Sequence, residues 1–173
     1  YTATIDGEWV AIDYARSRFG EDVKIILSGL SMGAATVLMA ADLKLPANVI
    51  GIIADCPYSS PKAIIQKVCK DLHMPAWFFY PFIKLGARLF AHFDLEESSA
   101  ISAVAHTNIP ILLIHGEDDR FVPCDMSRDI HKACASPIIF ETIPDAGHGL
   151  CYLISPQRYE EVTIQFIQSI LQN

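Results

Sequence analysis

Short, continuously apolar runs recur along the chain between longer segments of mixed character. Four of them are rich in Ile, Val and Leu and have the length of β-strands, at residues 24–27, 49–54, 111–114 and 137–143. Strands that helices cover on both faces show such runs, because both alternating sets of side chains are buried. We therefore expect four buried strands in one sheet.

The segments around these runs predict helices. Residues 5–19 have apolar side chains at helical intervals, and Gly20 is suited to the position that ends this helix. A short helix is expected at 126–134 and a longer one at 156–171, where Pro156 suits the first turn. Regular alternation of strand and helix predicts an α/β fold, with a parallel sheet and right-handed crossovers. The apolar stripe of the first helix consists of Ile5, Trp9, Ile12, Ala15 and Phe19.

The alternation is interrupted between the second and third strands. The chain from Tyr58 to Pro110 is far longer than a crossover requires. We predict a helical, cap-like insertion at residues 58–108, within a single domain that spans residues 1–173. Residues 74–90, MPAWFFYPFIKLGARLF, are rich in aromatic side chains. These side chains either line a pocket for an acyl group or pack a small core inside the insertion.

Composition excludes several classes of protein. The chain has 173 residues, enough for one sizeable core, and its 51% hydrophobic and 19% charged content excludes a disordered chain. The net charge is −7 with no basic block, so neither nucleic acid nor an anionic membrane is expected as a partner. Prolines, Lys84 and Arg88 interrupt the apolar residues 74–90, and the sequence predicts neither a signal peptide nor a membrane span.

The cysteines bear on redox compartment and on metal binding. Their number, five, is odd, and they form neither a CxxC pair nor a Cys/His zinc pattern. They predict reduced, mostly buried thiols in a cytoplasmic protein rather than a disulfide framework. Cys69 and His73 are spaced to share a helix face, but two ligands do not make a metal site. No metal ion or organic cofactor is predicted. The cysteines are Cys56, Cys69, Cys124, Cys134 and Cys151.

The first candidate catalytic motif is at residues 29–33. Their sequence, Gly-Leu-Ser-Met-Gly, matches the G-x-S-x-G nucleophile elbow. This motif holds a serine in a sharp, strained turn between a strand and a helix. Gly29 and Gly33 are expected to provide the room for that turn, because glycine has no Cβ. The following helix directs its free N–H groups at Ser31, and the backbone N–H of Met32 is the expected oxyanion donor. The alternative is a glycine-rich turn in an ordinary βα unit.

A serine hydroxyl needs an adjacent base, and that base needs an acid to orient it. Ser31 follows the first predicted strand and His148 follows the fourth. Asp118 and Asp119 follow the third strand, after His115, which is expected to close the strand end as a structural residue. The carboxyl ends of parallel strands open on one crevice, so we expect these side chains to converge there.

Three segments together resemble the α/β-hydrolase superfamily, in particular its bacterial serine hydrolases of the lipase, esterase and S33-aminopeptidase-like group. GLSMGAAT at residues 29–36 resembles the elbow of this family. IHGEDDRFVP at 114–123 resembles the acid loop, and DAGHGLCY at 145–152 resembles the histidine loop. The three motifs occur in the family's order and cover nearly the whole chain. The resemblance implies an α/β-hydrolase fold with a Ser–Asp–His triad.

By this resemblance, Ser31 is the nucleophile and His148 is the base. The acid of the family's HGxxDxxVP pattern lies three residues after the glycine, which is Asp119 here. Two other aspartates remain candidates for the acid. Asp55 ends the second strand, where some relatives keep their acid, and Asp118 is one position off the pattern and is expected to be a solvated neighbour.

The family pattern also includes a loop, well before the elbow, that supplies a second oxyanion N–H. The residues before Ser31 are accounted for by one predicted helix and one predicted strand, so they do not include this loop. The sequence is therefore interpreted as the C-terminal two-thirds of a hydrolase. Loss of one oxyanion donor costs about 100- to 1000-fold in rate. Residues 24–27 are then left at a bare, apolar sheet edge, through which two copies are expected to pair as a homodimer.

These observations give two predictions of function. The first is a serine hydrolase that cleaves small-molecule carboxylic esters through an acyl-enzyme and requires no cofactor. In this prediction Ser31 attacks the carbonyl, His148 transfers the proton and Asp119 orients the imidazole. The second is a catalytically impaired remnant that binds an apolar ligand or a second copy of the chain.

Overall fold

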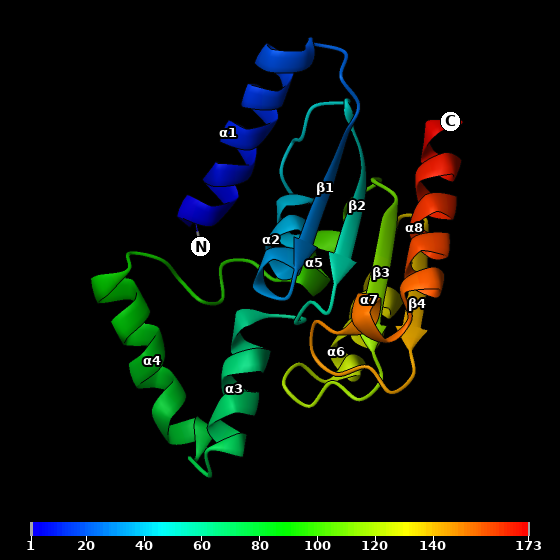
Figure 1. Ribbon diagram of the computed structural model, residues 1–173. Helices are drawn as coiled ribbons and strands as arrows, with labels where there is room; N and C mark the ends of the chain where they lie inside the picture. Colours follow the sequence, from blue (N-terminus) through cyan, green and yellow to red (C-terminus); the bar gives the residue numbers. More distant parts are fainter. Residues whose placement is uncertain (1, 173) are drawn as a thin grey trace.

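The centre of the molecule is a parallel sheet of four strands in the order β1-β2-β3-β4. Figure 1 shows the computed structural model, which describes residues 2–172. The strands are β1 (Ile25–Leu30), β2 (Val49–Asp55), β3 (Ile111–Gly116) and β4 (Ile138–Ile143). Each includes one of the apolar runs, or nearly all of it, so the predicted α/β fold with a partial parallel sheet is confirmed.

Helices cover both faces of this sheet (Figure 1). One face packs on α1, α2, α5 and α6 through a cluster that includes Leu38, Leu113 and Ile130. The other face packs on α8 through Phe166 and Ile170. None of the helices in the described part of the chain is long and apolar enough to cross a membrane. The helices are α1 (Thr2–Phe19), α2 (Met32–Ala40), α3 (Pro61–Asp71), α4 (Ala76–Phe90), α5 (Ala100–Val104), α6 (Cys124–Ala133), α7 (Cys151–Ile154) and α8 (Pro156–Leu171).

The first helix and the first strand are less buried than their patterns predict. In α1, Ile12 is buried but Phe19 is exposed, and the side chain of Ile5 lies outside the described residues. In β1 only Leu27 is buried, so the expectation of a strand covered on both faces is wrong for β1. The reason is its place at the edge of the sheet. The cluster under α8 is built on β2, β3 and β4 and takes only Ile26, partly buried, from β1.

Two helices project from the body of the molecule at the carboxyl end of the strands (Figure 1). We call them the α3–α4 arm, residues 61–90. The chain returns from the arm through α5, whose Ala100 and Val104 are buried in the main core. Ion pairs join the arm to the returning segment. The Nζ atom of Lys62 lies 3.0 Å from Glu96 Oε1, and that of Lys84 lies 3.3 Å from Asp94 Oδ1.

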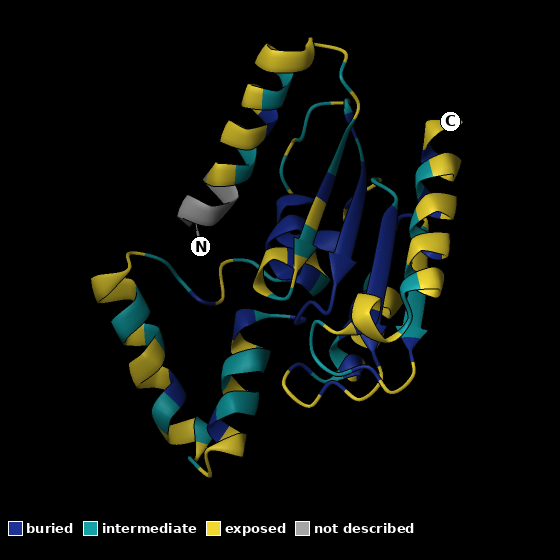
Figure 2. Ribbon diagram, viewed as in Figure 1, coloured by how far each residue is buried: buried dark blue, intermediate teal, exposed yellow. Residues whose placement is uncertain are grey.

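The aromatic side chains of α4 differ in burial, since Tyr80 is buried whereas four others are exposed. Trp77, Phe78, Phe82 and Phe90 are all exposed, as the yellow segments of α4 in Figure 2 show. These four side chains do not line the apolar pocket of about 280 Å³ between the two helices of the arm, to which α4 contributes Ile83. The pocket is lined by Ile64, Ile65, Val68, Cys69, Leu72, Met74 and Ile83.

Candidate active site

Ser31 lies in the turn between β1 and α2, in a backbone conformation that few residues adopt. Its φ is 55° and its ψ is −113°. Such a conformation costs a non-glycine residue about 1–3 kcal/mol. The turn is fixed from both sides. The N–H of Ser31 donates to the backbone carbonyl of Asp55 at 2.8 Å, and the carbonyl of Ser31 accepts from Ala35 at 3.0 Å in the first turn of α2. The strained turn that the motif predicts is therefore present.

The two glycines of the motif have different roles. A Cβ added at Gly29 would lie 2.3 Å from the carbonyl carbon of Gly33, which is a backbone clash. A Cβ added at Gly33 would meet nothing within 4 Å. The prediction that the turn needs a glycine is thus confirmed at Gly29 and wrong at Gly33. A side chain at position 29 would point at the backbone of the first turn of α2, whereas a side chain at position 33 would point into open space.

The three residues that the family resemblance assigns to a triad lie together at the carboxyl end of the sheet. They are Ser31, His148 and Asp119. Ser31 Oγ lies 2.9 Å from His148 Nε2, and His148 Nδ1 lies 2.7 Å from Asp119 Oδ2. One tautomer satisfies both contacts, because Nδ1–H donates to the carboxylate and Nε2 accepts from the serine hydroxyl. The side chain of His148 is 25% exposed and that of Asp119 is fully buried. A hydroxyl, an imidazole and a carboxylate are therefore hydrogen-bonded in series.

Asp119 is held as an ionised acid by its surroundings. Its Oδ1 accepts from the backbone N–H of Phe121 at 2.9 Å and of Val122 at 2.8 Å. Burial raises the pKa of Asp119, but hydrogen bonds from His115, His148 and Val122 outweigh burial and bring the pKa below its ordinary value. The carboxylate is consequently charged at neutral pH and able to orient the imidazole.

His115 belongs to this network, which the sequence pattern did not indicate. It is fully buried at the end of β3. Its Nε2–H donates to the carbonyl of Val122 at 2.9 Å and lies 3.3 Å from Asp119 Oδ2, while Nδ1 accepts from the hydroxyl of Ser127 at 2.6 Å. His115 therefore closes the strand end as expected, and it also braces Asp119. The His-Gly pair that precedes the acid loop was the available signal for this contact.

The other two candidate acids lie apart from His148. Asp118 is exposed, as expected of a solvated neighbour. Asp55 is buried on the α8 side of β2, where its Oδ2 accepts from the hydroxyl of Tyr159 at 3.2 Å. Burial raises the pKa of Asp55, and its Oδ1 has no hydrogen-bond partner among the described residues. Of the three aspartates, Asp119 is the one that the structure places against the histidine.

The rim of the site is apolar, a feature that sequence reasoning missed. Met32 and Leu30 flank the serine, and both are exposed. On the histidine side, the exposed ring of Phe121 meets the imidazole edge-on, with 5.0 Å between ring centroids, and Leu150 is also exposed. Phe121 lies inside the motif of the acid loop, so its position was available from the sequence although its contact was not.

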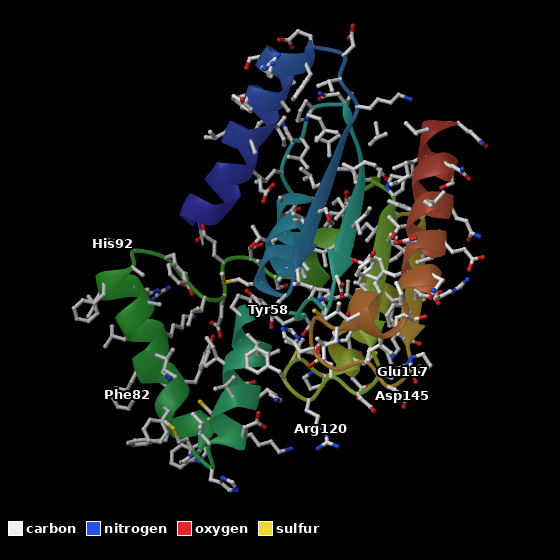
Figure 3. All side chains as sticks on the ribbon, in the orientation of Figure 1. Tyr58, Phe82, His92, Glu117, Arg120 and Asp145 are labelled. Atoms are coloured by element: carbon white, nitrogen blue, oxygen red, sulfur yellow. The ribbon has the colours of Figure 1, made fainter. Side chains whose placement is uncertain are left out.

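Charged residues follow β3 and β4 at the same end of the sheet. Figure 3 shows Glu117, Arg120 and Asp145 at the carboxyl end of the sheet, with Tyr58 between them and the arm. The arm itself reaches the rim. Lys67 of α3 donates to the carbonyl of Arg120 and lies 5.7 Å from the centroid of the Phe121 ring. The acid loop is thus fastened to the projecting helices.

Three side chains of the site carry atoms that could bind a metal ion. Within the described part of the chain, one group places three candidate ligand atoms within 4.8 Å of one another, and it consists of Cys56, Asp119 and His148. Two of its members are the acid and the imidazole already bonded to each other. All five cysteines are free thiols, and all but Cys134 are buried, as their scattered spacing predicts.

Known proteins match this chain in sequence and in fold. A model of the family described as "Alpha/beta hydrolase family" matches residues 2–162. The chain is also 21% identical over 145 residues to the uncharacterized protein YqkD of Bacillus subtilis (strain 168). That match covers 83% of this chain and 48% of YqkD, so the chain spans about half the length of this curated relative.

Solved structures show the same fold. An esterase of Pyrococcus furiosus superposes with a TM-score of 0.66 at 19% identity, over 92% of this chain and 59% of that one. A thermophilic esterase of Thermogutta terrifontis gives a TM-score of 0.61 at 19% identity, over 91% and 70%. An acylaminoacyl peptidase of Pyrococcus horikoshii gives 0.66 at 13% identity, over 91% and 26%.

Proposed function

Because the chain belongs to the alpha/beta hydrolase family, we propose that it is a serine hydrolase and that it cleaves small-molecule carboxylic esters. The observation that carries the proposal is the series of hydrogen bonds from Ser31 through His148 to Asp119, at 2.9 Å and 2.7 Å. Such a series activates a serine that is otherwise a weak nucleophile at neutral pH.

The reaction divides into two acyl transfers. Ser31 Oγ attacks the ester carbonyl carbon while its proton passes to His148 Nε2, and the carbonyl π electrons move to the oxygen. The tetrahedral intermediate collapses, the C–O bond to the alcohol breaks, and the alcohol leaves with the proton from Nε2. Water then attacks the acyl-enzyme in the same way, with His148 as the base, and restores the Ser31 hydroxyl. Asp119 keeps the imidazole in the tautomer that both steps need.

Met32 is the proposed oxyanion donor. It is the first residue of α2, so no carbonyl within the helix accepts from its N–H. The positive end of the helix dipole lies at the same place and favours the negative oxygen. A preorganised donor of this kind contributes about 100- to 1000-fold to the rate.

The apolar rim supports an ester with an apolar acyl group as the substrate. Phe121 and Leu150 are exposed beside His148, and Met32 is exposed beside the serine. Burial of an apolar group against such side chains contributes about 25 cal/mol for each Å² removed from water. The names of the Pyrococcus furiosus and Thermogutta terrifontis esterases add support to the choice of an ester.

The first prediction tests the nucleophile. Ser31→Ala is expected to lower the hydrolysis of p-nitrophenyl butyrate by about 1000-fold or more, because the remaining groups cannot form an acyl-enzyme. Ser28→Ala removes an exposed serine from β1, the strand that precedes Ser31, and serves as the matched control. Wild-type and control proteins should also be labelled by a fluorophosphonate, and Ser31→Ala should not. Hydrolysis that persists in Ser31→Ala would refute the assignment.

A second candidate function is a module that binds another copy of the chain through β1. The observation that favours it is the place of β1 at the edge of the sheet, paired with β2 on one side. An edge strand presents unpaired backbone groups to another strand. Light scattering and probe labelling together separate the two functions. A dimer whose Ser31 does not react with the fluorophosphonate supports the module, and a labelled monomer supports the hydrolase alone.

A further inference from the structure

Lys67 of α3 brings a charged group of the arm onto the acid loop, residues 114–123. Its Nζ donates to the backbone carbonyl of Arg120 and also to Asp71 Oδ2, the latter at 2.6 Å. The side chain of Lys67 is only 16% exposed, so solvent and salt screen these contacts less than those of a surface lysine. Lysine is rarely buried to this extent, and its place over the loop that carries the proposed acid needs a physical reason.

The carbonyl that Lys67 contacts belongs to the same peptide group as the N–H of Phe121. That N–H donates to Asp119 Oδ1 at 2.9 Å. A single amide therefore accepts from a cation at its oxygen and donates to the proposed acid at its nitrogen. Hydrogen bonds in such a chain polarise one another, and each becomes stronger than it would be alone. The ammonium group thus strengthens one of the two backbone hydrogen bonds that hold Asp119.

The ammonium group also lies against the ring beside the proposed base. Its Nζ is 5.7 Å from the centroid of the Phe121 ring. That ring meets the imidazole of His148 edge-on, with 5.0 Å between the centroids. A cation within about 6 Å of a ring centroid is attracted by the π electrons. Lys67 therefore holds the acid loop at two points, the peptide that bonds to Asp119 and the ring that contacts His148.

The helix presents Lys67 to the loop from a fixed position. The hydroxyl of Ser60 caps α3 by accepting from the N–H of Ala63 at 3.1 Å. Ile64, three residues before Lys67, packs on a cluster that includes Val122 of the acid loop. Residues three apart lie on the same face of a helix. An apolar contact and a charged contact on one face of α3 therefore join the arm to the acid loop.

We propose that Lys67 is a positioning residue for hydrolysis. Its ammonium group fixes the peptide between Arg120 and Phe121, and the N–H of that peptide keeps Asp119 in place as the partner of the imidazole. This inference rests on the proposed function and gives the α3–α4 arm a part in the reaction. Lys67 acts through the acid loop rather than on the ester. The role requires a positive charge that is also a donor, which arginine supplies and methionine does not.

Kinetics of Lys67 variants with p-nitrophenyl butyrate test the proposal. Lys67→Met keeps an unbranched side chain but loses the charge, and it should lower kcat by about 10-fold, because small misplacements of reacting groups are costly. KM should stay within about twofold, since methionine still packs on the Phe121 ring. Lys67→Arg keeps the charge and the donors and should recover most of the loss. Packing alone would give the opposite order, with Lys67→Met closer to the wild type.

Two matched controls come from the same helix. Lys62→Met removes similar contacts made elsewhere, an ion pair with Glu96 at 3.0 Å and a cation–π contact with the Tyr80 ring at 5.6 Å. Asp71→Asn removes the ion pair of Lys67 within α3 and leaves its contact with the acid loop in place. Both controls should keep kcat within about twofold of the wild-type value.

A second readout does not depend on turnover. The amide proton of Phe121 reports on its bond to Asp119 in the NMR spectrum. In Lys67→Met this proton should move upfield and exchange with solvent about 10-fold faster, because the carbonyl of the same peptide has lost a charge-assisted hydrogen bond. Lys62→Met should leave both quantities unchanged. If the wild-type protein fails to hydrolyse esters, the proposed function fails while the spectra still decide whether Lys67 holds Asp119.

Two results would overturn the proposal. One is a folded Lys67→Met protein with the wild-type kcat and an unchanged amide signal of Phe121. The other is an equal loss of kcat in Asp71→Asn and Lys67→Met, which would assign Lys67 to the stability of α3 alone. If Lys67→Met does not fold, the same measurements on Lys67→Gln decide the question, since glutamine is polar but uncharged. Wild-type values in that variant would overturn the proposal as well.

Discussion

Left-handed backbone conformations gather at the ends of the strands that carry the site. Ser31, Cys56 and Asp145 have φ values of 55°, 46° and 59°, and they follow β1, β2 and β4. Each costs about 1–3 kcal/mol relative to an ordinary conformation. The other two non-glycine residues with positive φ in the described chain, His73 and His92, follow the helices of the arm. The motif predicted the strain at Ser31, but an aspartate and a cysteine gave no comparable signal, because single residues of those types occur in many conformations.

Gly29 and Gly33 give a prediction at this scale. Gly29→Ala places a methyl group 2.3 Å from backbone and should destabilise the protein by about 1–3 kcal/mol, with loss of ester hydrolysis. Gly33→Ala adds a methyl group in open space within α2 and should stabilise the helix by about 0.5 kcal/mol. Urea unfolding of the two variants measures both effects. Equal destabilisation would show that the space around Gly33 is not open in solution.

Among the candidate acids, the choice of Asp119 came from the family pattern and agrees with the contacts. Periodicity and strand order placed Asp55, Asp118 and Asp119 near the same rim and could not choose between them. The choice depends on the direction of each side chain. Asp55 faces the side of β2 covered by α8, whereas Asp119 accepts from two backbone N–H groups of its own loop and from His148.

At the scale of elements, apolar runs and helical spacing located the sheet and most helices. The helix expected at 156–171 coincides with α8, whose Val162, Phe166 and Ile170 are buried. Periodicity indicates which face of a helix is apolar, but it does not say what covers that face. For this reason the exposure of α4 and the open side of β1 could not be read from the sequence, since both depend on neighbouring elements.

The attachment of the α3–α4 arm gives a prediction about pH. Hydrogen bonds from Lys84 and Lys62 lower the pKa of Glu96 from 4.5 to about 2. A depressed folded-state pKa means that these ion pairs stabilise the arm above pH 4.5 and are lost as the pH falls toward 2. Glu96→Gln should therefore increase amide hydrogen exchange in α4 at neutral pH, and the difference from wild type should vanish in acid.

Glu97→Gln is the matched control, because Glu97 is an exposed neighbour that forms no ion pair within the described residues. Fluorophosphonate labelling of Ser31 should be the same in all three proteins at neutral pH, since Glu96 does not contact the triad. Identical exchange in Glu96→Gln and wild type at neutral pH would mean that packing, rather than charge, holds the arm.

At the scale of the whole molecule, the sequence predicted that three distant loops meet at one rim. That prediction needed only the parallel order of the strands, because right-handed crossovers bring the carboxyl ends to one side. The contact of His115 with Asp119 did not follow from the order of the strands. Such a contact depends on the direction of each side chain, which strand order does not give, although His115 belongs to the pattern of the acid loop.

Assembly through β1 gives the last prediction. The N–H of Ser31 donates to β2, so the two-residue period of the strand directs the N–H groups of Ser28 and Leu30 away from the sheet. Ser28→Pro removes one outward donor without breaking the ladder to β2 and should convert a β1-paired dimer to a monomer. Light scattering across a range of concentrations measures this change. A dimer that survives Ser28→Pro would place the interface elsewhere.

The bond from Ser31 N–H to the carbonyl of Asp55 is the final rung of the ladder between β1 and β2. The strained turn at Ser31 is therefore continuous with the hydrogen-bonded ladder of the sheet. A change of Ser31 to an unstrained backbone conformation would break its hydrogen bond to Asp55. The turn is therefore not expected to relax while β1 and β2 stay paired. The strained conformation of Ser31 thus depends on the folded sheet. We expect the reactivity of Ser31 to be lost in the same cooperative transition in which the sheet unfolds.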